Sequence, residues 1–184
     1  MTTGRDREIH LETDRYLLTT LPPAGGREAF ARWAADPRVM GPLNLPARPL
    51  SEAQVAGYFA GFDNRNRLLF VVVERAGGRP VGFWNMQINP VHRTCSLHLA
   101  IGERDHWGQG VTQETGVRLI DWLFAERGLE KISLSVPETN RRMRNLLRQL
   151  GWPEEAVLAG ELAAADGSAL VMDAPPNRPP GVDL

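Results

Sequence analysis

The segment between residues 94 and 124 changes its apolar period from two to about 3.6 residues across a short loop with two glycines. In residues 94–102, one side carries Cys95, Leu97, Leu99 and Ile101, and the other carries Ser96, His98 and Ala100. After the loop HWGQGV, a helical stripe is formed by Gly116, Leu119, Ile120, Leu123 and Phe124. This pattern predicts a strand, a glycine loop and a helix, and therefore a domain that mixes both kinds of element.

The rest of the chain supplies further strands and helices for such a domain. Strand patterns cover residues 15–21, 68–74, 79–88 and 131–136, and AVLAGEL and SALVM predict a closing hairpin around Asp166 and Gly167. Helical patterns cover residues 26–35 and the segments after Ser51 and Asn140, whereas residues 37–49 hold four prolines and predict a loop. This order predicts an α+β fold with a mixed, mainly antiparallel sheet. We expect one domain over residues 1–172 and a flexible Pro-rich tail over residues 173–184.

The charge balance and the cysteine content indicate which binding partners and which cellular compartment to expect for this chain. The chain has 21 Lys and Arg against 22 Asp and Glu, so its net charge of −1 gives no reason to expect binding to nucleic acid or to a membrane surface. Cys95 is the only cysteine, and no apolar run has the length of a transmembrane helix or of a signal segment. Lys131 is the only lysine, which indicates a GC-rich bacterial gene. We expect a cytoplasmic protein, either a monomer or a homodimer.

The glycine loop is the main candidate for chemistry. The first N–H groups of a helix have no partner within the helix, and the helix dipole adds about half a positive charge there. A phosphate fits such a place, and Gly108 and Gly110 would let it approach the backbone closely. The alternative interpretation is that both glycines only form a turn. The chain contains neither a P-loop motif nor a G-x-G-x-x-G motif after a strand.

The motifs around this loop resemble those of the GNAT superfamily of N-acetyltransferases. That family carries [QR]-x-x-G-x-[GA] between a strand and the following helix, and its RimJ/RimL-like branch often reads Y-W-G-K-G-Y-[AG]-T-E-A. This chain reads H-W-G-Q-G-V-T-Q-E, followed downstream by V-P-E-T-N-R-R-M and L-G-W, where the branch has N-x-x-S and L-G-F. The resemblance extends over about residues 15–172 and implies the GNAT fold, with acetyl-CoA as the acetyl donor.

The resemblance also implies where acetyl-CoA binds. Its pyrophosphate would lie on the backbone of Trp107, Gly108, Gln109, Gly110, Val111 and Thr112. The strands at 94–102 and 131–136 would splay, so that Leu99, Ala100 and Ile101 could bond the pantetheine arm. Asn140 matches the family's asparagine near the pantetheine, although an ordinary helix N-cap is an equal alternative. Arg141 or Arg142 would clamp the 3′-phosphate, or these arginines form a solvated helix face.

The catalytic groups are less well defined by the sequence. His98 is our candidate for the general base, because an imidazole titrates near pH 6.5, and Ser96 is a candidate for holding a water. The alternative for His98 is a histidine packed in the sheet. Many relatives have a tyrosine after Asn140 that protonates the leaving thiolate, and here that role is unfilled.

The resemblance implies that the loop after the first helix, here residues 40–48, lines the acceptor site, and Trp33, Phe83 and Trp84 are candidate substrate-binding residues. The loop has no acidic cluster, which argues against polyamines and aminoglycosides and favours a protein N-terminus or a small, weakly charged amine. We therefore predict direct acetyl transfer from acetyl-CoA to a primary amine in a ternary complex, without a metal. The alternatives are a catalytically degenerate acyl-CoA-binding module and a purely structural domain.

Overall fold

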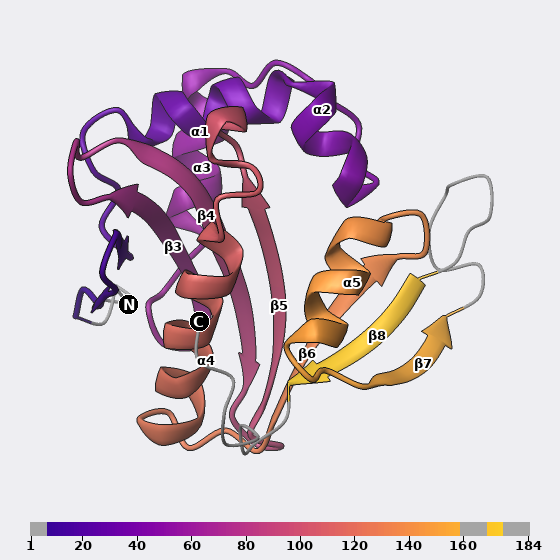
Figure 1. The fold of residues 1–184 in the computed structure, drawn as a ribbon. Helices are drawn as coiled ribbons and strands as arrows, with labels where there is room; N and C mark the ends of the chain where they lie inside the picture. Colours follow the sequence, from indigo (N-terminus) through magenta and orange to yellow (C-terminus); the bar gives the residue numbers. More distant parts are fainter. Residues whose placement is uncertain (1–6, 159–168, 175–184) are drawn as a thin grey trace.

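The computed structural model describes residues 7–158 and 169–174 and contains one eight-stranded sheet (Figure 1). The order of strands across the sheet is β1-β2-β3-β4-β5-β6-β8-β7. The strands are β1 (His10–Glu12), β2 (Tyr16–Thr19), β3 (Arg67–Glu74), β4 (Pro80–Asn89), β5 (Thr94–Ile101), β6 (Lys131–Pro137), β7 (Glu154–Leu158) and β8 (Ala169–Ala174). Of the pairings between these described strands only β5–β6 is parallel, so the predicted mixed, mainly antiparallel α+β fold is confirmed.

Helices cover both faces of this sheet (Figure 1). They are α1 (Gly26–Ala35), α2 (Pro37–Met40), α3 (Glu52–Ala60), α4 (Val111–Ala125) and α5 (Arg141–Gln149), with short 3₁₀ turns η1 (Gly41–Leu43) and η2 (Arg104–His106). A helix begins after Ser51, as predicted, and Ser51 caps it through a capping box with Gln54. Asn140 caps α5, which is one of the two roles that the sequence left open for it. None of the described helices is long and apolar enough to cross a membrane.

Two apolar cores lie on opposite faces of the sheet. The first contains Leu97 and Leu99 of β5 together with Leu119 and Leu123 of α4 and Leu147 of α5. The second joins Ala100 of β5 to apolar side chains of α1 and α3, including Ala29, Phe30, Trp33, Val55 and Phe59. The alternation predicted for residues 94–102 is therefore confirmed, because the two faces of β5 meet different cores, although Ser96 and His98 on the second face are exposed.

The structure differs from the sequence prediction at three places. The predicted loop at 37–49 contains α2 and η1, because Asp36 accepts a bond from the Arg38 N–H and Pro37 suits the first helical position. Strand β1 was not predicted, since only Leu11 of its three residues is buried. Strand β8 extends to Ala174 and thus includes the first residues of the predicted tail. The turn at Asp166 and Gly167 and the rest of that tail lie outside the described residues.

Candidate active site

The glycine loop between β5 and α4 has the backbone geometry of an anion cradle. Gly108 and Gly110 adopt φ angles of +82° and +75°, which side-chain-bearing residues rarely adopt, and Gly110 is the N-cap of α4. Within the described chain, no protein group accepts a hydrogen bond from the N–H groups of Gly108, Gly110, Val111 or Thr112. The cradle therefore has several free donors at the positive end of a 15-residue helix.

Other groups of the loop are used to hold it together. The Trp107 N–H donates to the Arg104 carbonyl and the Gln109 N–H donates to the His106 carbonyl. The Trp107 indole Nε1 donates to the Ile101 carbonyl at 2.7 Å, which fastens the loop to the end of β5. The sequence-based interpretation gave the loop residues one common role, whereas the geometry separates structural N–H groups from free ones.

A pocket of about 550 Å³ opens beside this loop, between α2, α4 and α5. Of the residues proposed from the sequence, it is lined by Leu99, Ala100, Ile101, Trp107, Gly108, Gly110, Val111, Thr112 and Asn140. Gln109, Arg141, Ser96, His98, Trp33, Phe83 and Trp84 do not line it. The structure thus brings together most of the expected cofactor residues, and it places the expected catalytic and substrate residues outside this pocket.

The pocket exists because β5 and β6 separate. Their parallel pairing runs only from Thr94 with Lys131 to Leu97 with Leu134. Beyond that point β5 continues to Ile101 along β4 alone, and its last three residues line the pocket. The predicted splay is present, and among the described strands the end of β5 has a neighbour only on the β4 side.

Asn140 occupies the opposite wall of the pocket and has both of its amide atoms engaged. Its Oδ1 accepts from the Met143 N–H at 3.2 Å, which makes it the N-cap of α5. Its Nδ2 donates to the Pro42 carbonyl at 3.1 Å and so connects α5 to η1. The helix-cap alternative is therefore correct as a description of the contacts, while the side chain still borders the pocket.

The arginines of α5 differ in their relation to the loop. Arg142 lines the pocket, and its guanidinium would lie 3.2 Å from a Cβ placed at Gly108. Arg141 is exposed and does not line the pocket. Of the two candidates for a phosphate clamp, Arg142 is the one beside the glycine loop.

His98 and Ser96 lie on the sheet face that also carries Ala100, and both keep solvent-exposed surface, although neighbouring groups partly desolvate the His98 ring. Their partners across the sheet are Asn85 and Gln87 of β4. Partial burial lowers the pKa of His98 below its ordinary value of 6.5, because desolvation disfavours the charged imidazolium. A neutral imidazole at pH 7 is able to accept a proton.

Sequence reasoning missed Tyr58 on this face. The Asn85 Nδ2 donates to the Tyr58 hydroxyl at 3.0 Å, so a phenol of α3 reaches the strand position opposite His98. Burial raises the pKa of Tyr58, although the bond from Asn85 opposes this, so the phenol stays protonated at neutral pH. No local signal marks Tyr58, because its α3 position alone does not say which strand it meets.

The three aromatic residues proposed for the acceptor site do not lie together. The rings of Trp33 and Phe83 stack with centroids 6.4 Å apart. Trp84 points to the other face, where its Nε1 donates to Thr115 Oγ1 within the first core. Successive residues of a strand face opposite sides, so Phe83 and Trp84 cannot share a site on one face.

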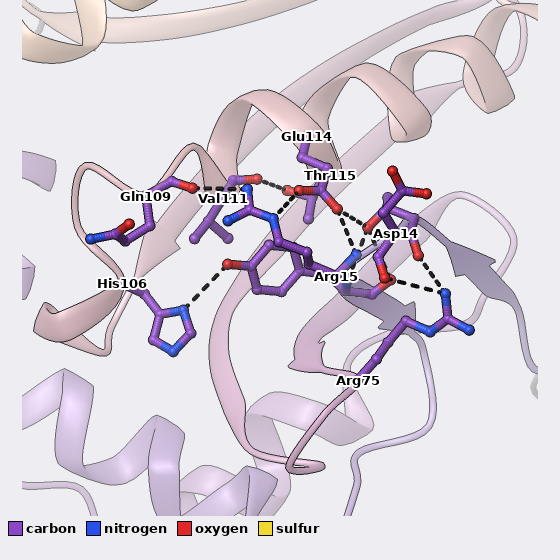
Figure 2. A network of polar contacts seen from close by, with 10 residues as sticks. Asp14, Arg15, Arg75, His106, Gln109, Val111, Glu114 and Thr115 are labelled. Carbon is purple, nitrogen blue, oxygen red and sulfur yellow. Dashed lines mark hydrogen bonds and ion pairs between the residues drawn. The ribbon is translucent and has the colours of Figure 1, made fainter. Parts of the chain in front are cut away.

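A second group that sequence reasoning missed surrounds the glycine loop itself (Figure 2). Arg15, from the turn before β2, contacts both Glu114 of α4 and the carbonyl of Gln109. Glu114 belongs to the quoted motif, but no feature of the sequence indicates its partner 99 residues away.

The sequence of this chain is similar to one known protein family. A sequence profile described as an acetyltransferase (GNAT) domain matches residues 15–152. A search of curated proteins found no match.

Solved structures of acetyltransferases have the same fold. Spermidine N-acetyltransferase from Vibrio cholerae, in complex with CoA and spermine, superposes with a TM-score of 0.76 at 20% identity, over 86% of this chain and 94% of that chain. A GNAT-family acetyltransferase from Bacillus anthracis gives 0.75 at 13% identity, over 91% and 99%. A GCN5-related N-acetyltransferase from Brucella melitensis gives 0.75 at 12% identity, over 94% and 81%.

The profile covers most of the chain, including β5, the glycine loop and the three helices α2, α4 and α5 that border the pocket. The splayed strands and the free N–H groups at the start of α4 agree with a site for acetyl-CoA. This chain belongs to the GNAT family of acetyl-CoA-dependent N-acetyltransferases.

Proposed function

We propose that this enzyme moves the acetyl group of acetyl-CoA directly to a primary amine, either a protein α-amine or a small, weakly charged metabolite or antibiotic. We place it in the RimJ/RimL-like branch of the family, with residues 1–172 as one catalytic domain. The observation that carries the proposal is the glycine loop with its free N–H groups at the mouth of the splay between β5 and β6.

The loop residues fit a pyrophosphate. The N–H groups of Gly108, Gly110, Val111 and Thr112 would donate to it, with Trp107 and Gln109 shaping the turn. A side chain at position 108 would be strained by its φ angle and would crowd Arg142. We assign the contact with the 3′-phosphate to Arg142 rather than to Arg141, because only Arg142 lines the pocket.

The free edge of β5 fits an extended amide-containing chain such as pantetheine. The Gly102 N–H donates to Val81 of β4, so the polar backbone groups of Leu99 and Ile101 face away from β4 by alternation. We propose that the Leu99 carbonyl and the Ile101 N–H bond the pantetheine arm, that Ala100 borders it, and that Asn140 closes the opposite side.

The catalytic step requires a neutral amine, a stabilised oxyanion and a proton for the thiolate. Acetyl-CoA supplies the thioester whose carbonyl carbon the amine attacks. His98 takes the proton of the amine, directly or through a water held by Ser96, and its lowered pKa keeps it neutral at pH 7. The Leu99 N–H stabilises the oxyanion. Tyr58, protonated and bonded to Asn85, is our candidate for the proton donor that the sequence left unfilled.

The charges near the aromatic pair favour an acceptor that is not a polycation. The nearest carboxylate, Glu103, accepts bonds from the Trp33 indole, Arg32 and Arg79. Two arginines therefore balance its charge, and among the described residues those that line the pocket include Arg38 but no Asp or Glu. A polyamine would gain no carboxylate there, so we expect spermidine to be a poor acceptor.

The test is a calorimetric titration with acetyl-CoA, followed by measurement of thiol release with a panel of amines. We expect tight binding by the wild type, loss of binding in Gly110→Trp, and thiol release with N-terminal peptides or small neutral amines but not with spermidine. Failure of the wild type to bind at high concentration would mean that the glycines only form a turn. Binding without thiol release for any amine would favour the degenerate acyl-CoA-binding module.

A further inference from the structure

We propose that Arg15, held by Glu114, is a positioning residue that fixes the glycine loop in its ligand-ready conformation. The proposal rests on the pyrophosphate site described above. It assigns a role in binding acetyl-CoA to a side chain that does not line the pocket and comes from the other end of the chain.

Arg15 makes three bonds that join the start of β2 to the loop and to α4 (Figure 2). Its Nε donates to Glu114 Oε2 at 2.7 Å, and its backbone N–H donates to Glu114 Oε1 at 2.9 Å. Its second guanidinium nitrogen donates to the Gln109 carbonyl at 2.9 Å. One side chain thus spans from the first turn of α4 to the residue between the two glycines.

Glu114 is fully engaged in this arrangement. Its Oε1 also accepts a hydrogen bond from the Thr13 hydroxyl, with 2.6 Å between the two oxygens. Its side chain is only 18% exposed. Burial would raise the pKa of Glu114, but the bonds from Thr13 and Arg15 outweigh it and lower the pKa. The carboxylate is therefore ionised at neutral pH and orients the guanidinium.

The bond to the Gln109 carbonyl controls the direction of an N–H group. The carbonyl of Gln109 and the N–H of Gly110 belong to one planar trans peptide unit, so they point in opposite directions. Because Arg15 holds that carbonyl on its own side, the Gly110 N–H points away from Arg15. Gly110 lines the pocket, and the Arg15 guanidinium lies beside it, since a Cβ on Gly110 would be 3.4 Å from that group.

The neighbouring residue supports the other end of the loop. The Tyr16 hydroxyl lies 3.4 Å from His106 Nδ1, and the two rings meet edge to face. Two consecutive residues, Arg15 just before β2 and Tyr16 at its start, therefore contact the loop after and before Gly108. A loop ordered in advance loses less conformational entropy when the ligand binds, which raises affinity without a direct contact.

The direct alternative is that Arg15 only attracts phosphate by its charge. That charge is paired with Glu114, and neither side chain lines the pocket. An orienting role predicts that loss of Glu114's charge weakens acetyl-CoA binding. If Arg15 only attracted phosphate, loss of the Glu114 charge would strengthen acetyl-CoA binding, because Arg15 would then carry an unbalanced positive charge.

The experiment compares Arg15→Ala, Glu114→Gln and the double variant by calorimetric titration with acetyl-CoA and by steady-state kinetics. Glu114→Gln keeps the shape and an oxygen acceptor. Glu130→Gln is the matched control, because it neutralises the carboxylate of an exposed ion pair with Arg93 at the far end of β5. We expect Kd to rise about tenfold in each single variant, no further in the double variant, and not in the control. We also expect the KM for acetyl-CoA to rise with kcat unchanged.

S-acetylpantetheine, which has no pyrophosphate, separates positioning from general loss of structure. Its kcat/KM should be the same in Arg15→Ala and in the wild type, whereas a disrupted fold would lower it. The proposal is overturned if Arg15→Ala and Glu114→Gln bind acetyl-CoA like the wild type while Gly110→Trp does not bind. Failure of the wild type itself to bind would instead overturn the proposed function.

Discussion

The Trp84 indole Nε1 donates to Thr115 Oγ1 at 3.0 Å, and the same hydroxyl donates to the Val111 carbonyl at 2.7 Å. Thr115 is fully buried and Trp84 is nearly so. The two residues therefore join β4 to the start of α4, the helix that follows the glycine loop. Gly116 leaves room for the Trp84 ring, since a Cβ there would lie 3.2 Å from it.

Replacement of Thr115 by valine should destabilise the protein by about 1–3 kcal/mol, because the buried Trp84 N–H would have no acceptor. Urea unfolding measures the difference. Thr115→Ser is the matched control, because it keeps the hydroxyl and should cost less than Thr115→Val. Equal losses in the two variants would show that the hydrogen bond contributes little.

Gly102→Ala should destabilise the fold strongly. A Cβ at this position would overlap the Trp33 indole, which is buried and held by its bond to Glu103. Gly57→Ala is the control, because a Cβ on that exposed position of α3 meets nothing within 4 Å. This control should gain about 0.5–1 kcal/mol. Thermal unfolding of both variants checks the prediction, and a Gly102→Ala variant as stable as the wild type contradicts it.

Glu103 should contribute stability that is lost in acid. Burial would raise its pKa, but bonds from Trp33, Arg32 and Arg79 outweigh this and hold the pKa below the ordinary value of 4.5. A carboxyl with a depressed folded-state pKa stabilises the fold above its unfolded pKa, and that contribution disappears as the pH falls through the folded pKa. The difference in unfolding free energy between wild type and Glu103→Gln should therefore be largest near pH 7 and shrink below pH 4.5. A pH-independent difference would argue against the ion-pair account.

His98→Gln should lower kcat by about 10²–10⁴ if His98 is the general base. Burial lowers its pKa, so wild-type kcat/KM should rise with pH through a value below 6.5, and the variant should lack this limb. His92→Gln, in the exposed turn before β5, is the control and should leave the profile unchanged. A normal profile in His98→Gln would assign the proton transfer to water alone.

The two arginines at the start of α5 should differ toward acetyl-CoA. Arg142→Ala should raise its Kd about tenfold, because Arg142 lines the pocket beside Gly108. Arg141→Ala should change it little. Titration with dephospho-CoA locates the contact, since the effect of Arg142→Ala should vanish when the 3′-phosphate is missing. An effect that persists there points to the pyrophosphate instead.

Local patterns predicted those parts of the molecule that depend on local physics. The alternation of residues 94–102, the helix that begins after Ser51 and the order of strand, glycine loop and helix around Gly108 and Gly110 all follow from neighbouring residues. The short helix α2 was missed because four prolines indicate a loop, although Asp36 and Pro37 are a good helix start. Placing Trp84 beside Phe83 overlooked the alternation that the same reasoning applied to β5.

Contacts between distant segments could not be predicted in this way. The bond between Asn85 and Tyr58 joins β4 to α3, which are separated along the chain by β3, and its geometry depends on how α3 packs. Asn140 had two interpretations in the sequence, and only the tertiary contact with Pro42 explains why one side chain caps a helix and borders the pocket.

The bond between Arg15 and Glu114 limits how far the chain can be shortened from its N-terminal side without changing the glycine loop. A fragment that begins after β2 would contain both loop glycines, all of α4 and every residue that lines the pocket. It would still lack the guanidinium that turns the Gln109 peptide. A loop motif grafted into another scaffold would therefore keep its sequence but not the orientation of its peptide groups. The residue that sets this orientation, Arg15, lies 99 residues before Glu114.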